Sequence, residues 1–121
     1  MEGDAKGLRE KLDRQMRELA ATAAALARAE RAAAGEPKVP HYSRIELAAH
    51  EVGRALSREI QTREARELVA ESPQRATCPG CGRDGPVEAA TRQVKSVDGP
   101  LDLFEVRVYC ARCRRAFFPS A

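Results

Sequence analysis

Four cysteines form two matched pairs in this chain, and their spacing is suited to binding a metal ion. The pairs are Cys78-Pro79-Gly80-Cys81 and Cys110-Ala111-Arg112-Cys113. A C-x2-C turn points two thiolates at one place, so two such turns supply the four sulfurs of a tetrahedral zinc site. The 28 residues between Cys81 and Cys110 are enough for a β-hairpin that brings the two turns together. We therefore predict one structural Zn2+ ion bound by Cys78, Cys81, Cys110 and Cys113.

Other uses of the cysteines fit the sequence less well. A thioredoxin-like redox site has one pair in a βαβ context, and neither condition is met. Disulfides require export, yet the N-terminal sequence Met-Glu-Gly-Asp-Ala-Lys has no apolar segment typical of a signal peptide. Iron and a metal-free thiol cluster stay open, because spacing identifies a sulfur site better than it identifies the metal. His41 and His50 are expected to be ordinary polar residues.

Composition favours two small modules over one large domain. The 121 residues include three phenylalanines, two tyrosines and no tryptophan, so a large aromatic core is not available. Residues 1–72 contain 13 basic and 13 acidic residues, whereas residues 73–121 contain 8 and 5, so the net charge of +3 lies in the cysteine module. No apolar run is long enough to span a bilayer. We expect a soluble, cytoplasmic protein with a helical segment at 1–72 and a zinc ribbon at 73–121.

Two helices are predicted in the first module. Residues 4–34 are rich in Ala, Arg, Glu and Leu, and Leu12, Leu19 and Leu26 recur every seven residues. This narrow apolar stripe is interpreted either as the face of a helix that packs on its neighbour or as a self-association seam. Gly35, Pro37 and Pro40 mark a linker near 35–42.

The second helix has its own start and stop signals. Ser43-Arg44-Ile45-Glu46 has the pattern of a capping box, and apolar residues follow at spacings of three and four until Pro73 ends the pattern. Two such helices form a hairpin or a coiled-coil-like segment.

The residue pattern changes from helix to strand after Pro73. Residues 87–97 and 101–109 are each typical of a strand, and residues 98–100 (Asp-Gly-Pro) are typical of a turn. The fold class is therefore α+β, with a β-hairpin that brings the second cysteine pair back to the first. Phe117 and Phe118 are expected to cover the apolar face of the hairpin, and an exposed aromatic platform for bases is the alternative.

The cysteine module resembles a known family. The Cys-Pro-Gly-Cys-Gly turn, the Arg107-x-Tyr109-Cys110 strand that leads to the second pair, and Phe117-Phe118-Pro119 are similar to the N-terminal region of bacterial insertion-sequence transposases of the ISKra type. The resemblance covers about residues 43–121. In that family an acidic-triad nuclease core follows, whereas this sequence stops at Ala121. The resemblance therefore implies DNA contact or help in transposase assembly, and it does not carry DNA cleavage to this chain.

Basic residues around the cysteines are the candidates for DNA contact. Guanidinium groups suit phosphates and guanine edges because they donate two parallel hydrogen bonds. The same positive charges could instead offset a zinc–thiolate site or lie on a solvated face. The candidate residues are Arg83, Arg92, Lys95, Arg112, Arg114 and Arg115.

The function expected from the sequence is a non-catalytic zinc ribbon that contacts DNA or assists a transposase. No phosphate loop, nucleophile elbow or arguable carboxylate pair is present, so neither an enzyme nor a small-molecule substrate is expected. The alternative is a protein–protein adaptor in which the ribbon is a structural staple and the helices bind a partner. That partner would be a second copy of the chain or a transposase.

Overall fold

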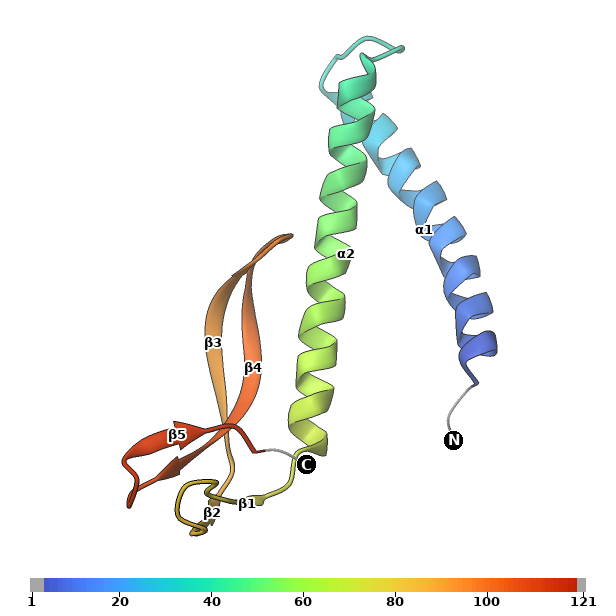
Figure 1. Cartoon of the computed structure of the whole chain (residues 1–121). Coiled ribbons are helices and arrows are strands. Elements are labelled where there is room, and N and C mark those ends of the chain that lie inside the picture. Colours follow the sequence, from blue (N-terminus) through green and yellow to red (C-terminus); the bar gives the residue numbers. More distant parts are fainter. Residues whose placement is uncertain (1–3, 120–121) are drawn as a thin grey trace. The chain divides into compact units, whose positions relative to one another are not determined.

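The computed structural model describes residues 4–119 and has an α+β fold. Two helices are followed by antiparallel strands, as predicted, and these strands form two small sheets (Figure 1). The secondary structure changes from helix to strand between residues 71 and 75. The two compact units of the chain, residues 1–53 and 54–121, do not follow this change. The boundary between them lies inside the second helix. The second part of that helix therefore belongs with the strands.

Helix α1 spans Ala5–Ala33 and has a conventional start. The Asp4 side chain caps it by accepting a hydrogen bond from the Gly7 N–H. The helix ends before Gly35, which adopts a left-handed φ of 72°. None of its residues is buried, and the large apolar side chains of its stripe are exposed. These residues are Leu8, Leu12, Met16, Leu19 and Leu26.

Helix α2 spans Tyr42–Glu71 and begins one residue earlier than the predicted capping box allows. Ser43 lies inside the helix, so the capping-box prediction is wrong. His41 takes the capping role instead, because its Nδ1 accepts from the Ser43 N–H at 3.2 Å and its carbonyl accepts from the Arg44 N–H at 2.9 Å. A histidine ring reaches the same orphan N–H groups that a serine would satisfy.

Five strands form the rest of the fold. Strands β1 (Arg75–Thr77) and β2 (Asp84–Pro86) make a two-stranded sheet. Strands β3 (Glu88–Ser96), β4 (Gly99–Cys110) and β5 (Arg115–Phe117) make a three-stranded sheet with β4 in the middle. Only β3 and β4 were predicted, since β1, β2 and β5 have three residues each and give little periodic signal.

The turn between β3 and β4 is tighter than predicted. Ser96 pairs with Gly99 and Lys95 pairs with Pro100, which leaves Val97 and Asp98 as the two turn residues. Gly99 has a φ of 115°, and the Ser96 hydroxyl donates to the Gly99 carbonyl at 2.6 Å. The predicted turn at 98–100 is therefore shifted by one residue, because Gly99 supplies the conformation and Pro100 is accommodated in the strand.

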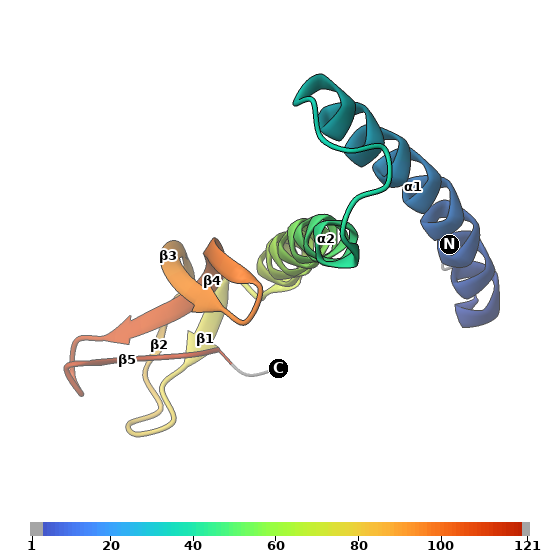
Figure 2. The same cartoon turned by 90° about the horizontal axis from the view of Figure 1, so that it is seen from above.

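The second part of α2 packs along the β3–β4 hairpin (Figures 1 and 2). The Ser57 hydroxyl donates to the Asp98 carboxylate, and Arg58 Nη1 donates to the Asp98 carbonyl, both at 2.6 Å. Further along the helix, the Arg66 guanidinium lies 4.7 Å from the centre of the Phe104 ring. These contacts join the helix to the hairpin at two places.

The buried core of this part of the chain is small. Its apolar members are Ala65 of α2, Leu101 and Val108 of β4, and the cysteines Cys78 and Cys110. Val108 is 1% exposed, and an added Cβ at Gly85 of β2 would lie 3.2 Å from its Cγ1. The two sheets therefore meet directly at Val108, beside the cysteines.

Candidate metal centre

The first cysteine pair lies in the turn that connects β1 to β2. The register pairs Thr77 with Asp84, so Cys78 and Cys81 are held between two paired strand ends. The Cys78 N–H donates to the Arg83 carbonyl at 2.8 Å, and the Gly82 N–H donates to the Cys78 carbonyl at 2.9 Å. Gly82 has a φ of 77°, a conformation that glycine adopts without a Cβ penalty. We call residues 78–83 the first knuckle.

The second pair lies in the turn from β4 to β5. Cys110 is the last residue of β4, and its register partner is Arg115 of β5. The Arg114 N–H donates to the Cys110 carbonyl at 2.7 Å, and the Cys113 N–H donates to the Cys110 sulfur at 3.4 Å. Arg114 has a φ of 56°, at the position that corresponds to Gly82 in the first knuckle. We call residues 110–115 the second knuckle.

The four sulfurs gather into one cluster, as predicted. Their Sγ atoms all lie within 4.8 Å of one another. Two of the separations join opposite knuckles, at 3.7 Å between Cys78 and Cys113 and 3.5 Å between Cys81 and Cys110. A tetrahedral zinc with bonds of about 2.3 Å requires sulfur separations of about 3.8 Å. All four cysteines are free thiols, so the geometry suits a metal and no disulfide is present among them.

The electrostatics of the cluster also suit a cation. The pKa of Cys78 is lowered to about 6, first because the Cys81 backbone N–H donates to its thiolate. The pKa of Cys110 is lowered because the Cys113 N–H donates to it. Contacts with the thiols of Cys81 and then Cys78 raise the pKa of Cys113 to about 12. Four adjacent thiolates therefore need a positive charge at their centre to be ionised together.

There is little free space around the sulfurs. An added Cβ at Gly80 would lie 3.1 Å from Arg115 Nη2 and 3.4 Å from Cys113 Sγ. The Arg115 guanidinium thus crosses from the second knuckle to the first and lies close to the cluster. A fixed cation at this place offsets the negative charge of a metal–thiolate centre.

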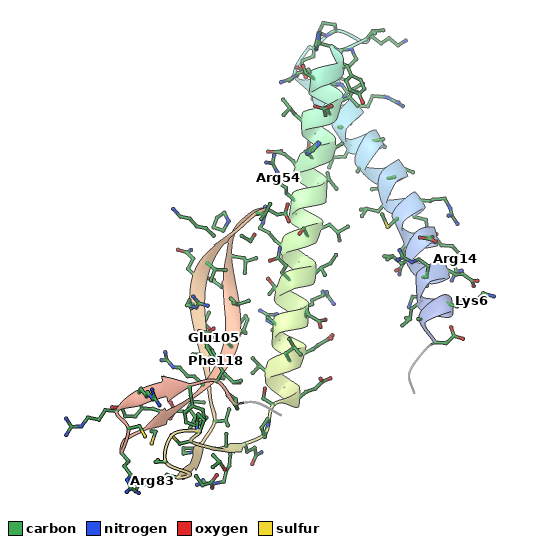
Figure 3. The ribbon with its side chains drawn as sticks, viewed as in Figure 1. Lys6, Arg14, Arg54, Arg83, Glu105 and Phe118 are labelled. Carbon is green, nitrogen blue, oxygen red and sulfur yellow. The ribbon has the colours of Figure 1, made fainter. Side chains whose placement is uncertain are left out.

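The predicted basic residues fall into two groups. Arg83, Arg112, Arg114 and Arg115 lie in the two knuckles, and all four are exposed. None of them forms an ion pair with any residue between 4 and 119. Figure 3 shows the labelled Arg83 side chain near the yellow sulfur atoms, pointing away from the sheets.

Arg92 and Lys95 are placed differently. Arg92 lies on β3 and forms an ion pair with Glu105 of β4 at 3.2 Å, so its charge is largely offset within the sheet. Lys95 pairs with Pro100 next to the β3–β4 turn, at the end of the hairpin opposite to the knuckles. The structure therefore does not bring these two residues together with the knuckle arginines.

The C-terminal aromatic residues do not act as one unit. Phe117 pairs with Val108 and is half-buried on the core side. Phe118 is 69% exposed, so the expectation that both rings cover the apolar face is wrong for Phe118. Tyr109, on the opposite side of β4 from Val108, is 61% exposed. The alternation of side chains along β4 is the signal that identifies Tyr109 as an outward residue.

Neither histidine joins the metal cluster, which contains only the four cysteines. His41 caps α2. His50 lies within that helix and is exposed.

Within residues 4–119, neither helix combines the length and apolar character needed to cross a bilayer.

No protein-family model, curated protein or solved structure matches the chain.

Proposed function

We propose that the cysteine cluster holds one structural zinc ion and that the knuckle arginines bind the phosphates of DNA, without catalysis. Zinc would join the two knuckles and contribute folding free energy. The sulfur separations near those of a tetrahedral site support this choice. Four thiolates complete the coordination of zinc, so no position remains for a reactive water.

The arrangement of the arginines carries the DNA part of this proposal. Four exposed arginines lie in the two knuckles that hold the cysteines, whereas Arg75 and Arg92, also from the strand region, pair with carboxylates. An arginine without an intramolecular partner is available to a phosphate. Arg115 lies nearest the sulfurs and offsets their charge, which leaves Arg83, Arg112 and Arg114 to face a ligand.

The backbone of Arg114 supports a functional reading of that residue. Its φ of 56° lies in the left-handed region, where a non-glycine residue costs about 1 kcal/mol. The first knuckle has Gly82 at the corresponding position and avoids that cost. Strained residues often occur at functional sites. We therefore infer that the strain at Arg114 is kept because a guanidinium at this position binds the ligand.

This contrast provides a test that separates folding from binding. Arg114→Gly should raise the free energy of unfolding by up to about 1 kcal/mol, because glycine relieves the strain. The same change should weaken binding to duplex DNA about eightfold at 0.1 M salt, since each lost phosphate contact removes about 0.9 from the salt slope. Fluorescence anisotropy of labelled DNA at several salt concentrations measures the affinity and the salt slope, and urea unfolding measures the free energy of unfolding.

Arg14→Ala in α1 is the charge-matched control, and its DNA affinity should stay near that of the unchanged chain. If Arg114→Gly folds normally and binds DNA as tightly as the control, the knuckle arginines are not the binding site. Zinc itself is checked separately by elemental analysis, with one zinc per chain as the expected result. Stoichiometric iron would replace zinc in the proposal.

The exposed stripe of α1 favours a second candidate function, that of an adaptor. Large apolar side chains exposed along one helix are typical of a surface that a partner covers. Leucines at positions 12, 19 and 26 suit a coiled coil with a second copy of α1 or with a transposase, as the resemblance implies. Sedimentation equilibrium of the unchanged chain and of Leu19→Glu tests the homodimer. A monomer in both cases would remove the self-association reading.

A further inference from the structure

Two exposed aromatic residues belong to the region of β4 and β5: Tyr109 lies in β4, and Phe118 is the residue that directly follows β5. Tyr109 is 61% exposed and Phe118 is 69% exposed. The register pairs Val108 with Phe117 and Tyr109 with Ala116. Since Val108 is buried and successive side chains alternate between the two sides of a strand, Tyr109 points outward. Phe118 follows the half-buried Phe117 directly, one residue beyond the end of β5.

The positive charge near Tyr109 comes from Arg107 and from the exposed arginines of the second knuckle. Arg107 lies two residues before Tyr109 on β4 and is exposed. The acidic residue two positions further back, Glu105, is held by Arg92 at 3.2 Å. Glu88 is the register partner of Arg107, and no ion pair forms between these two residues. Tyr109 therefore lies along β4 between Arg107, which forms no ion pair with residues 4–119, and the arginines of the second knuckle.

From this arrangement we propose that the outer side of β4 and β5 binds a single strand of nucleic acid. Two successive bases would stack on Tyr109 and Phe118, while Arg107 and the knuckle arginines hold the phosphates. In a duplex, the faces of the bases are already covered by neighbouring base pairs, so exposed rings add little there. This inference rests on the proposed nucleic-acid function and specifies the form of nucleic acid that is bound.

The chain offers a matched control for this test. Tyr42 of α2 is 70% exposed, close to the value for Tyr109, and it lies in the other compact unit. Tyr109→Ala and Phe118→Ala remove the proposed stacking rings, whereas Tyr42→Ala removes an equally exposed ring elsewhere. Tyr109→Phe keeps the ring and loses only the hydroxyl. Circular dichroism and zinc content of each variant show whether it folds.

The experiment is a set of anisotropy titrations with a labelled single-stranded DNA, its duplex, and the RNA of the same sequence. We expect tighter binding to a single strand than to the duplex. Each ring deletion should weaken single-strand binding by about 5-fold or more, the lower end of the effect of one stacked base. Tyr109→Phe and Tyr42→Ala should stay within about twofold of the unchanged chain, and duplex binding should change little in all variants.

The outcomes separate this inference from the function on which it rests. A preference for either the DNA or the RNA single strand supports the inference and identifies the sugar. Duplex binding that depends on Arg114 but not on Tyr109 or Phe118 overturns the inference and keeps the proposed function. If no nucleic acid binds at low salt, both are overturned, and the aromatic surface is assigned to a protein partner.

Discussion

Replacing Val108 with alanine tests the contact on which the two sheets depend. Val108 is 1% exposed, and Val108→Ala removes two buried methyl groups. At about 0.8 kcal/mol for each group, the transfer term is about 1.6 kcal/mol, and the unfilled space raises the loss to about 2–3 kcal/mol. Val97→Ala is the matched control, because Val97 is 101% exposed at the β3–β4 turn. Its effect should be within about 0.5 kcal/mol.

Gly85 allows a second test of the same contact between β2 and Val108. A methyl group at Gly85 would lie 3.2 Å from Val108 Cγ1, closer than comfortable contact, and Gly85 does not have a left-handed φ. In the unchanged chain, Gly85→Ala should therefore be neutral or mildly destabilising. In the Val108→Ala background the crowding is gone and the new methyl fills part of the space. We expect Gly85→Ala to stabilise that variant by about 1 kcal/mol, a non-additive result.

Urea unfolding of the zinc-loaded chain at one fixed zinc concentration measures the free energy of unfolding of Gly85→Ala, Val108→Ala and the double variant. Tyr109 fluorescence reports on the strands when Tyr42→Phe is present in every variant, since these two residues are the only tyrosines. The packing argument fails if Val108→Ala and Val97→Ala unfold at the same urea concentration. Strict additivity of Gly85→Ala and Val108→Ala would show that β2 does not pack on Val108.

Two further predictions concern the metal and the turn glycine. Cys113→Ser, or zinc removal by a chelator, should abolish amide exchange protection in β1 to β5 while α1 keeps its own. The reason is that, among residues 4–119, the buried apolar residues besides the cysteines are only Ala65, Leu101 and Val108. Unchanged protection in β4 without metal would show that this core suffices. Gly82→Ala should cost about 1 kcal/mol because the φ of Gly82 is 77°. Gly53→Ala in α2 should instead stabilise the chain by about 1 kcal/mol, because an added Cβ there meets nothing within 4 Å. Thermal unfolding measures both changes. Equal effects at the two glycines would contradict the turn geometry.

Local chemistry made much of the fold predictable. Helix composition and proline positions placed both helices to within a few residues, and the C-x2-C spacing identified the four sulfurs that the structure brings within 4.8 Å. These signals are strong because the residues that produce them are close in sequence. The predicted domain boundary at residue 72 also rests on local sequence. The boundary between the compact units depends instead on contacts between residues far apart in sequence, such as Ser57 with Asp98.

The unpredicted features depend on partners that a linear pattern does not specify. Whether Arg92 is free or paired depends on Glu105, a neighbour across the sheet. The exposure of Phe118 depends on where β5 ends, and a three-residue strand has no periodic signal. The cap of α2 was assigned to Ser43 because Ser43-x-x-Glu46 has the pattern of a capping box, whereas in the structure the His41 ring accepts the hydrogen bond from the Ser43 N–H.

The pairing of β3 with β4 has a consequence for how the chain reaches its native state. The two strands are joined by a two-residue turn, so this hairpin can form early, on a time scale of about microseconds. The hairpin carries Cys110 toward the first knuckle, but only in one alignment. A slip of one residue would turn Val108 and Cys110 outward and Tyr109 inward, because side chains alternate along a strand. In a misaligned hairpin, Cys110 would point away from the other three sulfurs. The four-sulfur site therefore forms only when the two strands are correctly aligned.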